Sequence, residues 1–299
     1  MLTPGRFIAI PNSQGSAFDH GAFDPQTQRV FVAHTGANTL DVLDHREGRH
    51  LHTLPDFPEA AGVVVGNGQV LVTNRGSASL AVVESATLER RTTIPVSPRP
   101  NGVAIAPKKG LAVVACIGDD THPPVLHCCP VSGGEQTTLP LPGRPRWCVV
   151  DADETRVFLA IQDPSIILVA GLPDLSLIAQ WPLPSAGAHG VDIDPLGNRL
   201  FVACDGGTLV ALSTETGSME ESWPLPGGPD ATFFNPDSGL VHVAVGNPGV
   251  VVSVNPATGE MATCVTEARA GTTALVRPDR LSVFLRERGG ALELIEQTG

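Results

Sequence analysis

The sequence predicts an all-β fold: a seven-bladed β-propeller in which each blade is a four-stranded antiparallel sheet. Three observations support this prediction. A repeat of about 42 residues runs through the chain, each repeat contains short segments that alternate apolar and polar residues, and the turns between them are rich in glycine and proline. Seven such repeats fill nearly all of the 299 positions. We therefore expect one propeller domain that covers residues 1–299.

One register of the repeat is an apolar residue, or tryptophan, followed by proline. It occurs at Ile10-Pro11, Leu54-Pro55, Ile94-Pro95, Leu139-Pro140, Trp181-Pro182 and Trp223-Pro224, with Thr266 where a seventh proline would fall. Successive copies are 40 to 45 residues apart. This register predicts the end of the fourth strand in each unit.

A second register marks the strands that come before it in each unit. Prolines close a short strand at Pro25, Pro107, Pro195, Pro236 and Pro278. The segments 21–44 and 190–213 run in the same order, with three short strands of period-2 alternation joined by Gly, Asn, Asp and Pro turns. Radial repetition of four-stranded units describes a propeller, and no helix of any length is needed. A β-sandwich would not require this period.

The two ends of the chain predict how the ring closes. The N-terminal segment RFIAIP, residues 6–11, matches the proline-ended fourth strand, whereas the C-terminal unit from Thr272 to Glu296 supplies only three strands. We therefore expect the N-terminal strand to complete the last blade, which removes two exposed sheet edges. A closed ring leaves no free edge for pairing with another copy, so the expected state is a monomer.

Composition narrows the class of partner. The chain has 19 Lys and Arg against 31 Asp and Glu, with only two lysines, and shows no basic patch for a phosphate backbone. We therefore expect no nucleic-acid partner. No apolar run reaches the roughly 18 residues of a spanning helix, so no membrane partner is expected. The start of the chain has no visible secretory signal, which predicts a cytoplasmic protein, or an exported one if a signal has been removed.

The six cysteines contain no C-x-x-C pair, so neither a zinc ribbon nor a thioredoxin motif is present. We expect them to be buried free thiols in strands. Cys128 and Cys129 are adjacent in an alternating strand, where neighbours point to opposite faces, so a bridge between them would distort the peptide. Both are expected to be reduced.

The repeats resemble a known family. Leu71-Val72-Thr73-Asn74 followed by RGSASLAVVE looks like the signature of the YVTN-type β-propeller repeat, and residues 31–44 and 90–107 look like further copies. The resemblance covers nearly the whole chain and is specific for fold rather than activity. Proteins similar to it include surface-layer and exported binding propellers, and related propellers act as lactonases or as redox-enzyme subunits.

Two rings of side chains are predicted to line the funnel at one end of the channel. At the start of the innermost strand, alignment on the prolines places His20 or Asp19, Glu59, Asn101, Arg146 or Trp147, His189, Asp230 and Thr272. At the end of the second strand it places His34, Asn74, Cys116, Ile161, Cys204, Val245 and Glu287. From these rings the ligand-binding candidates are His20, His34, Asn74, Asn101, Arg146, Trp147, His189, Asp230 and Glu287.

Three functions remain open at this point. The first is a binding or scaffold protein whose funnel holds a peptide, a protein or a small ligand, because a complete repeat framework contains no motif that demands chemistry. The second is a metal-dependent hydrolase or lyase, lactonase-like, with His20, His189, Asp230 and Asn101 as the candidates for direct contact with a divalent metal. The third is an accessory protein in which Cys116 and Cys204 bind a soft metal such as copper. Polar residues also occur in such channels simply because the channel is wet.

Overall fold

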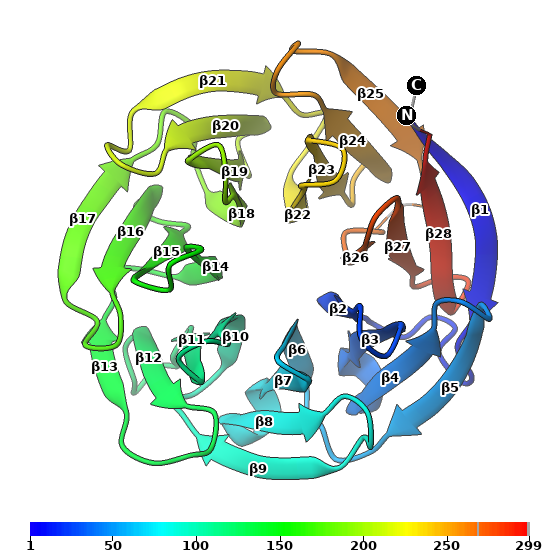
Figure 1. Ribbon diagram of the computed structural model, residues 1–299, viewed down its shortest axis with the longest axis horizontal. Coiled ribbons are helices and arrows are strands. Elements are labelled where there is room, and N and C mark those ends of the chain that lie inside the picture. Colours follow the sequence, from blue (N-terminus) through cyan, green and yellow to red (C-terminus); the bar gives the residue numbers. More distant parts are fainter. Residues whose placement is uncertain (268, 298–299) are drawn as a thin grey trace.

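A computed structural model describes residues 1–267 and 269–297 and shows seven four-stranded antiparallel sheets arranged in a ring (Figure 1). The predicted seven-bladed β-propeller is confirmed. We number the blades 1 to 7 in chain order, and within each blade the strands follow one another from the channel outward. In blade 7 the outermost strand comes from the N-terminus.

The strand bounds follow the repeat. The innermost strands are β2 (Gly21–Asp24), β6 (Ala60–Gly66), β10 (Pro100–Ala106), β14 (Pro145–Val150), β18 (Ala188–Asp194), β22 (Pro229–Asn235) and β26 (Thr273–Val276). The second strands are β3 (Arg29–His34), β7 (Gln69–Asn74), β11 (Leu111–Cys116), β15 (Arg156–Ile161), β19 (Arg199–Cys204), β23 (Leu240–Val245) and β27 (Arg280–Leu285).

The remaining strands lie further from the channel. The third strands are β4 (Thr39–Asp44), β8 (Ser79–Glu84), β12 (Val125–Pro130), β16 (Ile166–Gly171), β20 (Thr208–Ser213), β24 (Val250–Val254) and β28 (Gly290–Glu296). The outermost are β5 (Arg49–Leu54), β9 (Arg90–Pro95), β13 (Thr137–Pro140), β17 (Leu177–Pro182), β21 (Met219–Pro224), β25 (Met261–Val265) and β1 (Leu2–Ala9). Two single 3-10 turns, η1 (Thr35–Ala37) and η2 (Arg75–Ser77), follow β3 and β7.

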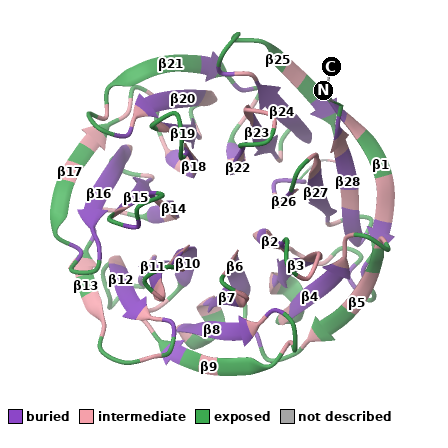
Figure 2. Cartoon of the chain, viewed as in Figure 1, coloured by how far each residue is buried: buried purple, intermediate pink, exposed green. Residues whose placement is uncertain are grey.

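Burial explains the composition of the strands. The second and third strands are buried on both faces, because each blade packs against its two neighbours, and they are accordingly runs of Val, Leu, Ile and Ala. The outermost strands are largely exposed, as the green outer rim in Figure 2 shows. Their terminal prolines are tolerated because an outer edge needs no further hydrogen-bond partner.

The N-terminal strand closes the ring as predicted. β1 pairs antiparallel with β28, from Leu2 opposite Glu296 to Ala9 opposite Gly290, with an irregularity between Pro4 and Phe7. The strand begins at Leu2, four residues earlier than the predicted segment at 6–11. The extra pairing covers the whole outer edge of β28, so the last blade has the same four strands as the others.

Hydrophobic clusters lie between adjacent blades. One cluster joins blades 3 and 4 and includes Cys128, and another joins blades 2 and 3 and includes Cys129. The two neighbouring cysteines therefore point to opposite faces of β12, as expected. All six cysteines are buried, free thiols. The described parts of the chain contain no helix with the length and apolar character that a membrane crossing requires.

Candidate functional site in the central channel

The innermost strands place equivalent residues at three depths in the channel. In five blades the strand carries a bulge next to its start, so that two residues face one on the second strand. The first of the two forms what we call the mouth ring: Asp19, Ala61, Asn101, Arg146, His189, Asp230 and Gly271. The second forms the middle ring: His20, Gly62, Gly102, Trp147, Gly190, Ala231 and Thr272.

Two residues further along each strand lies the lower ring. By register it consists of Ala22, Val64, Ala104, Val149, Asp192, Phe233 and Ala274. Ala274 is fully buried against blade 1, and Leu275 lines the channel in its place. All its members except Asp192 are apolar. The channel therefore changes from polar at the mouth to apolar beyond the middle ring.

The structure places the residues of the first predicted ring at two depths. Asn101, Arg146, His189 and Asp230 are members of the mouth ring, and in blade 1 the equivalent residue is Asp19. His20, Trp147 and Thr272 lie one residue deeper, in the middle ring. Placing Glu59 in this ring was wrong: it precedes β6 at a positive φ of 48°, its backbone N–H donates to Asn38 Oδ1, and the mouth position is occupied by Ala61.

The second predicted ring is displaced by one residue. His34, Asn74, Cys116 and Cys204 are at most 2% exposed and do not line the channel. Because side chains alternate along a strand, the last residue of each second strand packs into the blade and the next residue points to the mouth. The residues that were missed are therefore Arg75, Gln162 and Asp205, which follow Asn74, Ile161 and Cys204. Glu287 is exposed in the turn after β27, which ends at Leu285.

The side chains behind the mouth have structural partners. His34 is buried inside blade 1, where its Nδ1 lies 2.8 Å from Asp41 Oδ2 and its ring stacks on Phe18. Asn74 Nδ2 donates to Ser79 Oγ. These hydrogen bonds join neighbouring strands of the same blade, so the side chains of His34 and Asn74 stabilise the blades to which they belong.

The metal hypotheses are not supported. Among residues 1–267 and 269–297, no group of three or more His, Cys, Asp or Glu side chains is placed to hold a metal ion. Burial raises the pKa of the Cys116 and Cys204 thiols to about 12, so neither forms the thiolate that binds soft metals. The two sulfurs also belong to different hydrophobic clusters, one between blades 2 and 3 and one between blades 4 and 5.

One side of the mouth is an ion-pair network. Arg75, from η2, donates from Nη2 to Asp19 Oδ2 at 2.7 Å and also to Asn101 Oδ1. The His20 Nδ1 atom lies 2.5 Å from Asp19 Oδ1. Burial alone would raise the pKa of Asp19, but the neighbouring His20 and Arg75 lower it to about 2. Asp19 is therefore ionised and fully paired.

The opposite side of the mouth presents an oriented imidazole. His189 Nδ1 lies 2.7 Å from Asp205 Oδ1, and Gln162 Nε2 donates to Asp205 Oδ2 at 2.6 Å. Despite the opposing effect of burial, the hydrogen bonds and charges of His189 lower the pKa of Asp205, so Asp205 accepts and Nδ1 donates. His189 Nε2 is thereby directed to the channel, 3.6 Å from Asp230 Oδ1.

Arg146 differs from the other charged residues of the mouth. Its side chain is half-buried, its Nε is fully covered, and this Nε has no hydrogen-bond partner among the described residues. Burial, together with Arg144 and Arg75, lowers the pKa of Arg146, against the opposing attraction of Asp205 and Asp230. The guanidinium group nevertheless keeps its charge at neutral pH, because an arginine titrates far above it.

Two bulky middle-ring residues close the channel. The indole of Trp147 on blade 4 stacks on the imidazole of His20 on blade 1, with ring centroids 4.0 Å apart and an angle of 8° between the planes. The two strands come from distant positions on the ring, so the indole reaches across the channel (Figure 1). The middle-ring glycines fit this crowded level, since a β-carbon at Gly102 would lie 2.3 Å from the Arg146 carbonyl oxygen.

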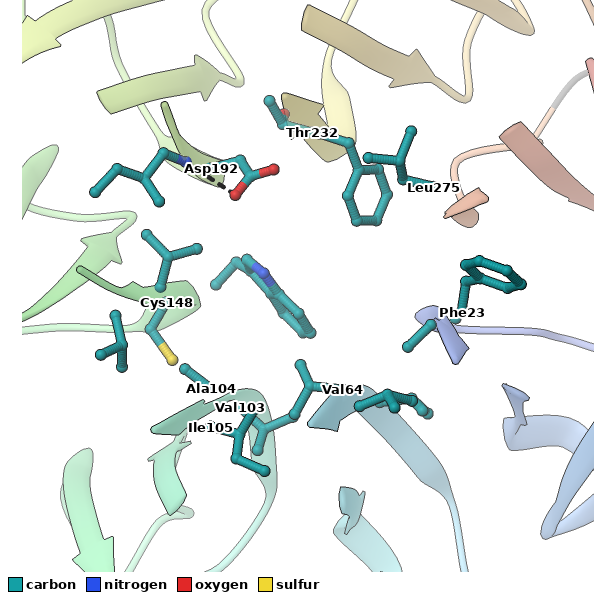
Figure 3. A pocket seen from close by; sticks show the side chains of 18 residues that line it. Phe23, Val64, Val103, Ala104, Ile105, Cys148, Asp192, Thr232 and Leu275 are labelled. Atoms are coloured by element: carbon teal, nitrogen blue, oxygen red, sulfur yellow. Dashed lines mark hydrogen bonds between the residues drawn. The ribbon is translucent and has the colours of Figure 1, made fainter. Parts of the chain in front are cut away.

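Beyond Trp147 lies a cavity of about 300 Å³. All seven innermost strands contribute to its walls, and Trp147 borders it on the side of the mouth. Figure 3 shows Asp192 on one wall and Phe23 on the opposite one. Asp192 accepts hydrogen bonds from the Ile193 N–H at Oδ1 and from the Phe234 N–H at Oδ2, both at 2.8 Å. Burial without a charged partner raises its pKa to about 7.

Comparisons with known proteins define the fold. No protein-family model and no curated protein match the sequence, so the resemblance to YVTN repeats stays a prediction. The chain is similar in structure to streptogramin B lyase, with a TM-score of 0.82 and 14% identity, covering 97% of this chain and 96% of that one. It is also similar to hydrazine synthase of Kuenenia stuttgartiensis, with a TM-score of 0.83 and 13% identity, covering 96% and 97%.

A third similar structure is a chain of the mitotic checkpoint complex, with a TM-score of 0.83 and 12% identity, covering 99% of this chain and 92% of that one. These proteins differ in activity, and likeness at such low identity shows the fold alone. The class that fold and comparisons define is the seven-bladed β-propeller. The function has to be argued from the channel.

Proposed function

We propose that the protein is a binding propeller whose mouth ring holds a carboxylate group of its ligand at Arg146. The observation that carries this proposal is the half-buried guanidinium whose Nε has no hydrogen-bond partner among the described residues. A guanidinium group that is half-buried and poorly paired is held away from water at a cost in free energy. The two terminal nitrogens of Arg146 are not among the covered atoms, and a bidentate carboxylate would bind both of them.

The surrounding residues favour a ligand that also carries hydrogen-bond donors. Asp230 is partly exposed, and its Oδ1 faces His189 at 3.6 Å, too far for a hydrogen bond. A ligand N–H or O–H could bind there while its carboxylate binds Arg146. A peptide, a protein segment with an acidic side chain or a small amino-acid-like molecule has this combination. A rigid disc of seven blades presents such a site without needing to rearrange.

The test compares two capped tripeptides that differ in charge. Ac-Gly-Glu-Gly-NH2, its glutamine counterpart and N-acetylglutamate are titrated against the wild type, Arg146→Gln and Arg49→Gln, and the indole N–H signals are followed by NMR. Arg49 is exposed on β5 and serves as the matched control. We expect acid-selective binding that weakens with salt and is lost only in Arg146→Gln. Equal binding of the glutamine peptide, or unchanged binding in Arg146→Gln, contradicts the proposal.

A second candidate function rests on His189. Asp205 fixes its Nδ1 hydrogen, so Nε2 is free to act as a general base, beside a cation at Arg146 that would stabilise a developing oxyanion. This arrangement favours a metal-independent hydrolase or lyase. A panel of lactones and esters tests it with the wild type, His189→Gln and the control His52→Gln, an exposed residue of β5. Turnover that disappears only in His189→Gln supports it, and the same rate in all three proteins overturns it.

A further inference from the structure

The lower cavity contains polar groups that the mouth does not use. Asp192 and Thr232 come from adjacent blades, and Figure 3 shows both at the cavity wall. Thr232 is 3% exposed, and its Oγ1 has no hydrogen-bond partner among the described residues. Each oxygen of Asp192 accepts one backbone N–H, which leaves one acceptor position on each. The Asp192 carboxyl group is therefore the polar side chain that this cavity offers to a ligand, because the Thr232 hydroxyl oxygen is fully covered and packs against Gly190.

The rest of the wall is suited to an apolar body and a positive charge. Trp147, Phe23 and Phe233 are the aromatic members of the lining, and Val64, Ile105 and Leu275 are among its aliphatic members. No Lys, Arg or Glu is among the residues that line it. Aromatic faces attract cations, and the net charge of −12 adds a negative potential. An anionic ligand would find no partner here.

We propose that the lower cavity is a binding site for a small organic ammonium ion with an apolar, ring-containing body. The ammonium group would donate to Asp192, and the body would pack between Phe23, Phe233 and the indole of Trp147. The volume of about 300 Å³ lies at the small end of ligand sites. This site lies on the other side of Trp147 from Arg146, so the proposal does not depend on the function of the mouth.

Binding is expected to depend on pH through Asp192. The other ionisable groups on the strands packed against β18, and on β18 itself, are Arg146, Cys148, Arg156, Arg199, Cys204, Asp230, His189 and Asp194. Arg146, His189 and Asp230 are at the mouth, and Arg156 and Arg199 face Asp151 and Asp194. Burial raises the pKa of the Cys148 and Cys204 thiols to about 12, so both are neutral.

An ammonium ion binds the ionised form of Asp192, whose pKa in the free protein is about 7. The affinity for the ammonium ion should therefore rise by about tenfold between pH 6 and pH 8. Binding near pH 6 should release the proton that Asp192 holds in the free protein. The amine itself stays protonated over this range, because alkylamines resemble the lysine side chain. A site in which a protonated carboxyl group donates to a neutral ligand would show the opposite trend, with affinity falling as pH rises.

The experiment is calorimetric titration of the wild type with 2-phenylethylamine and a short series of smaller and larger arylalkylamines. 2-Phenylethanol and 3-phenylpropionate are the neutral and anionic controls. Asp192→Asn keeps the shape of the side chain and removes its charge, and Asp153→Asn, at an exposed turn residue outside the channel, is the matched control. Repetition at pH 6 in two buffers of different ionisation enthalpy measures the proton released.

The expected result is that the amines bind, that Asp192→Asn lowers affinity by at least about tenfold, and that Asp153→Asn does not. 2-Phenylethanol should bind at least about tenfold more weakly than the amine. Three results overturn the proposal: no amine in the series binds, the alcohol binds as tightly as the amine, or affinity is the same at pH 6 and pH 8. The comparison with the alcohol and the comparison between pH 6 and pH 8 use only the wild-type protein, so they test the proposal even if Asp192→Asn does not fold.

Discussion

The mouth and the lower cavity are two halves of one channel, built by the same seven strands, yet they shift the pKa of a carboxyl group in opposite directions. At the mouth, Arg75 and His20 hold the pKa of Asp19 at about 2. In the lower cavity, the described residues give Asp192 two backbone N–H donors and no cationic partner, and its pKa rises to about 7. Burial acts on both residues in the same direction. The presence or absence of a cationic partner decides the sign of the shift.

The stack of Trp147 on His20 separates the two halves, and the glycines around it allow the blades to meet at this level. The largest expected effect therefore comes from crowding the middle ring. Gly102→Val brings a β-carbon to 2.3 Å from the Arg146 carbonyl oxygen, and we expect a loss of about 4 kcal/mol in the free energy of unfolding. Gly228→Val, whose β-carbon meets nothing within 4 Å, is the control for urea unfolding. Equal losses would contradict the close contact.

Removing the stacked indole should connect the two halves. Trp147→Ala loses the contact with His20 and the apolar packing, at a cost of about 3 kcal/mol. The indole covers part of the cavity beside Asp192, so its removal should lower the pKa of Asp192 toward the ordinary value of 3.8. Trp181→Ala, on β17, also removes a half-buried indole but should leave that pKa unchanged. An unchanged Asp192 titration in Trp147→Ala would show that the indole does not isolate the cavity.

The isolated carboxyl should also make stability depend on pH. The pKa of Asp192 is higher in the folded protein, about 7, than its ordinary 3.8, so the folded state holds the proton more tightly and loses stability as pH rises between these values. Relative to Asp192→Asn, the wild type should lose about 2 kcal/mol between pH 4 and pH 8, because the carboxyl still faces a cavity. Parallel stability curves for the two proteins would contradict this.

The smallest effect is expected at the paired mouth. Asp19→Asn breaks the contacts with Arg75 and His20 and should cost about 1 kcal/mol, since these side chains are partly exposed. The pKa of Asp19 is depressed, so its contribution is present above about pH 4 and is lost as pH falls toward 2. A loss of the same size at pH 2 and pH 7 would show that the substitution acts through packing instead.

The repeat was sufficient to predict the blades and the closure of the ring, because proline positions and alternation determine strands directly. It was not sufficient to predict which side chain faces the channel. The bulge in the innermost strand and the turn after the second strand each shift by one residue the side chain that faces the channel. Asn74 and Cys204 were therefore predicted in place of Arg75 and Asp205. A shift of one residue turns a strand side chain to the other face.

Two signals in the sequence could have located the divided channel. The segment Gly190-Val-Asp-Ile-Asp-Pro aligns with Gly102-Val-Ala-Ile-Ala-Pro, and the two differ at Asp192, where the other repeat has Ala104, and at Asp194, where it has Ala106. In the same way, Pro145-Arg-Trp aligns with Pro100-Asn-Gly, which makes Trp147 the bulky residue at a glycine position. Neither pattern shows that Trp147 would meet His20, because that contact joins two distant blades and exists only in the folded ring.

The central claim is that one channel contains a charged mouth and, behind an indole, an apolar cavity with a single unpaired carboxyl group. Its most direct test is an NMR titration of the aspartate side-chain carboxyl carbons in the wild type and in Asp192→Asn. The account predicts one resonance with a midpoint near pH 7, absent from the variant. A wild-type protein in which every aspartate titrates below about pH 5, as unperturbed or paired carboxyl groups do, would contradict it.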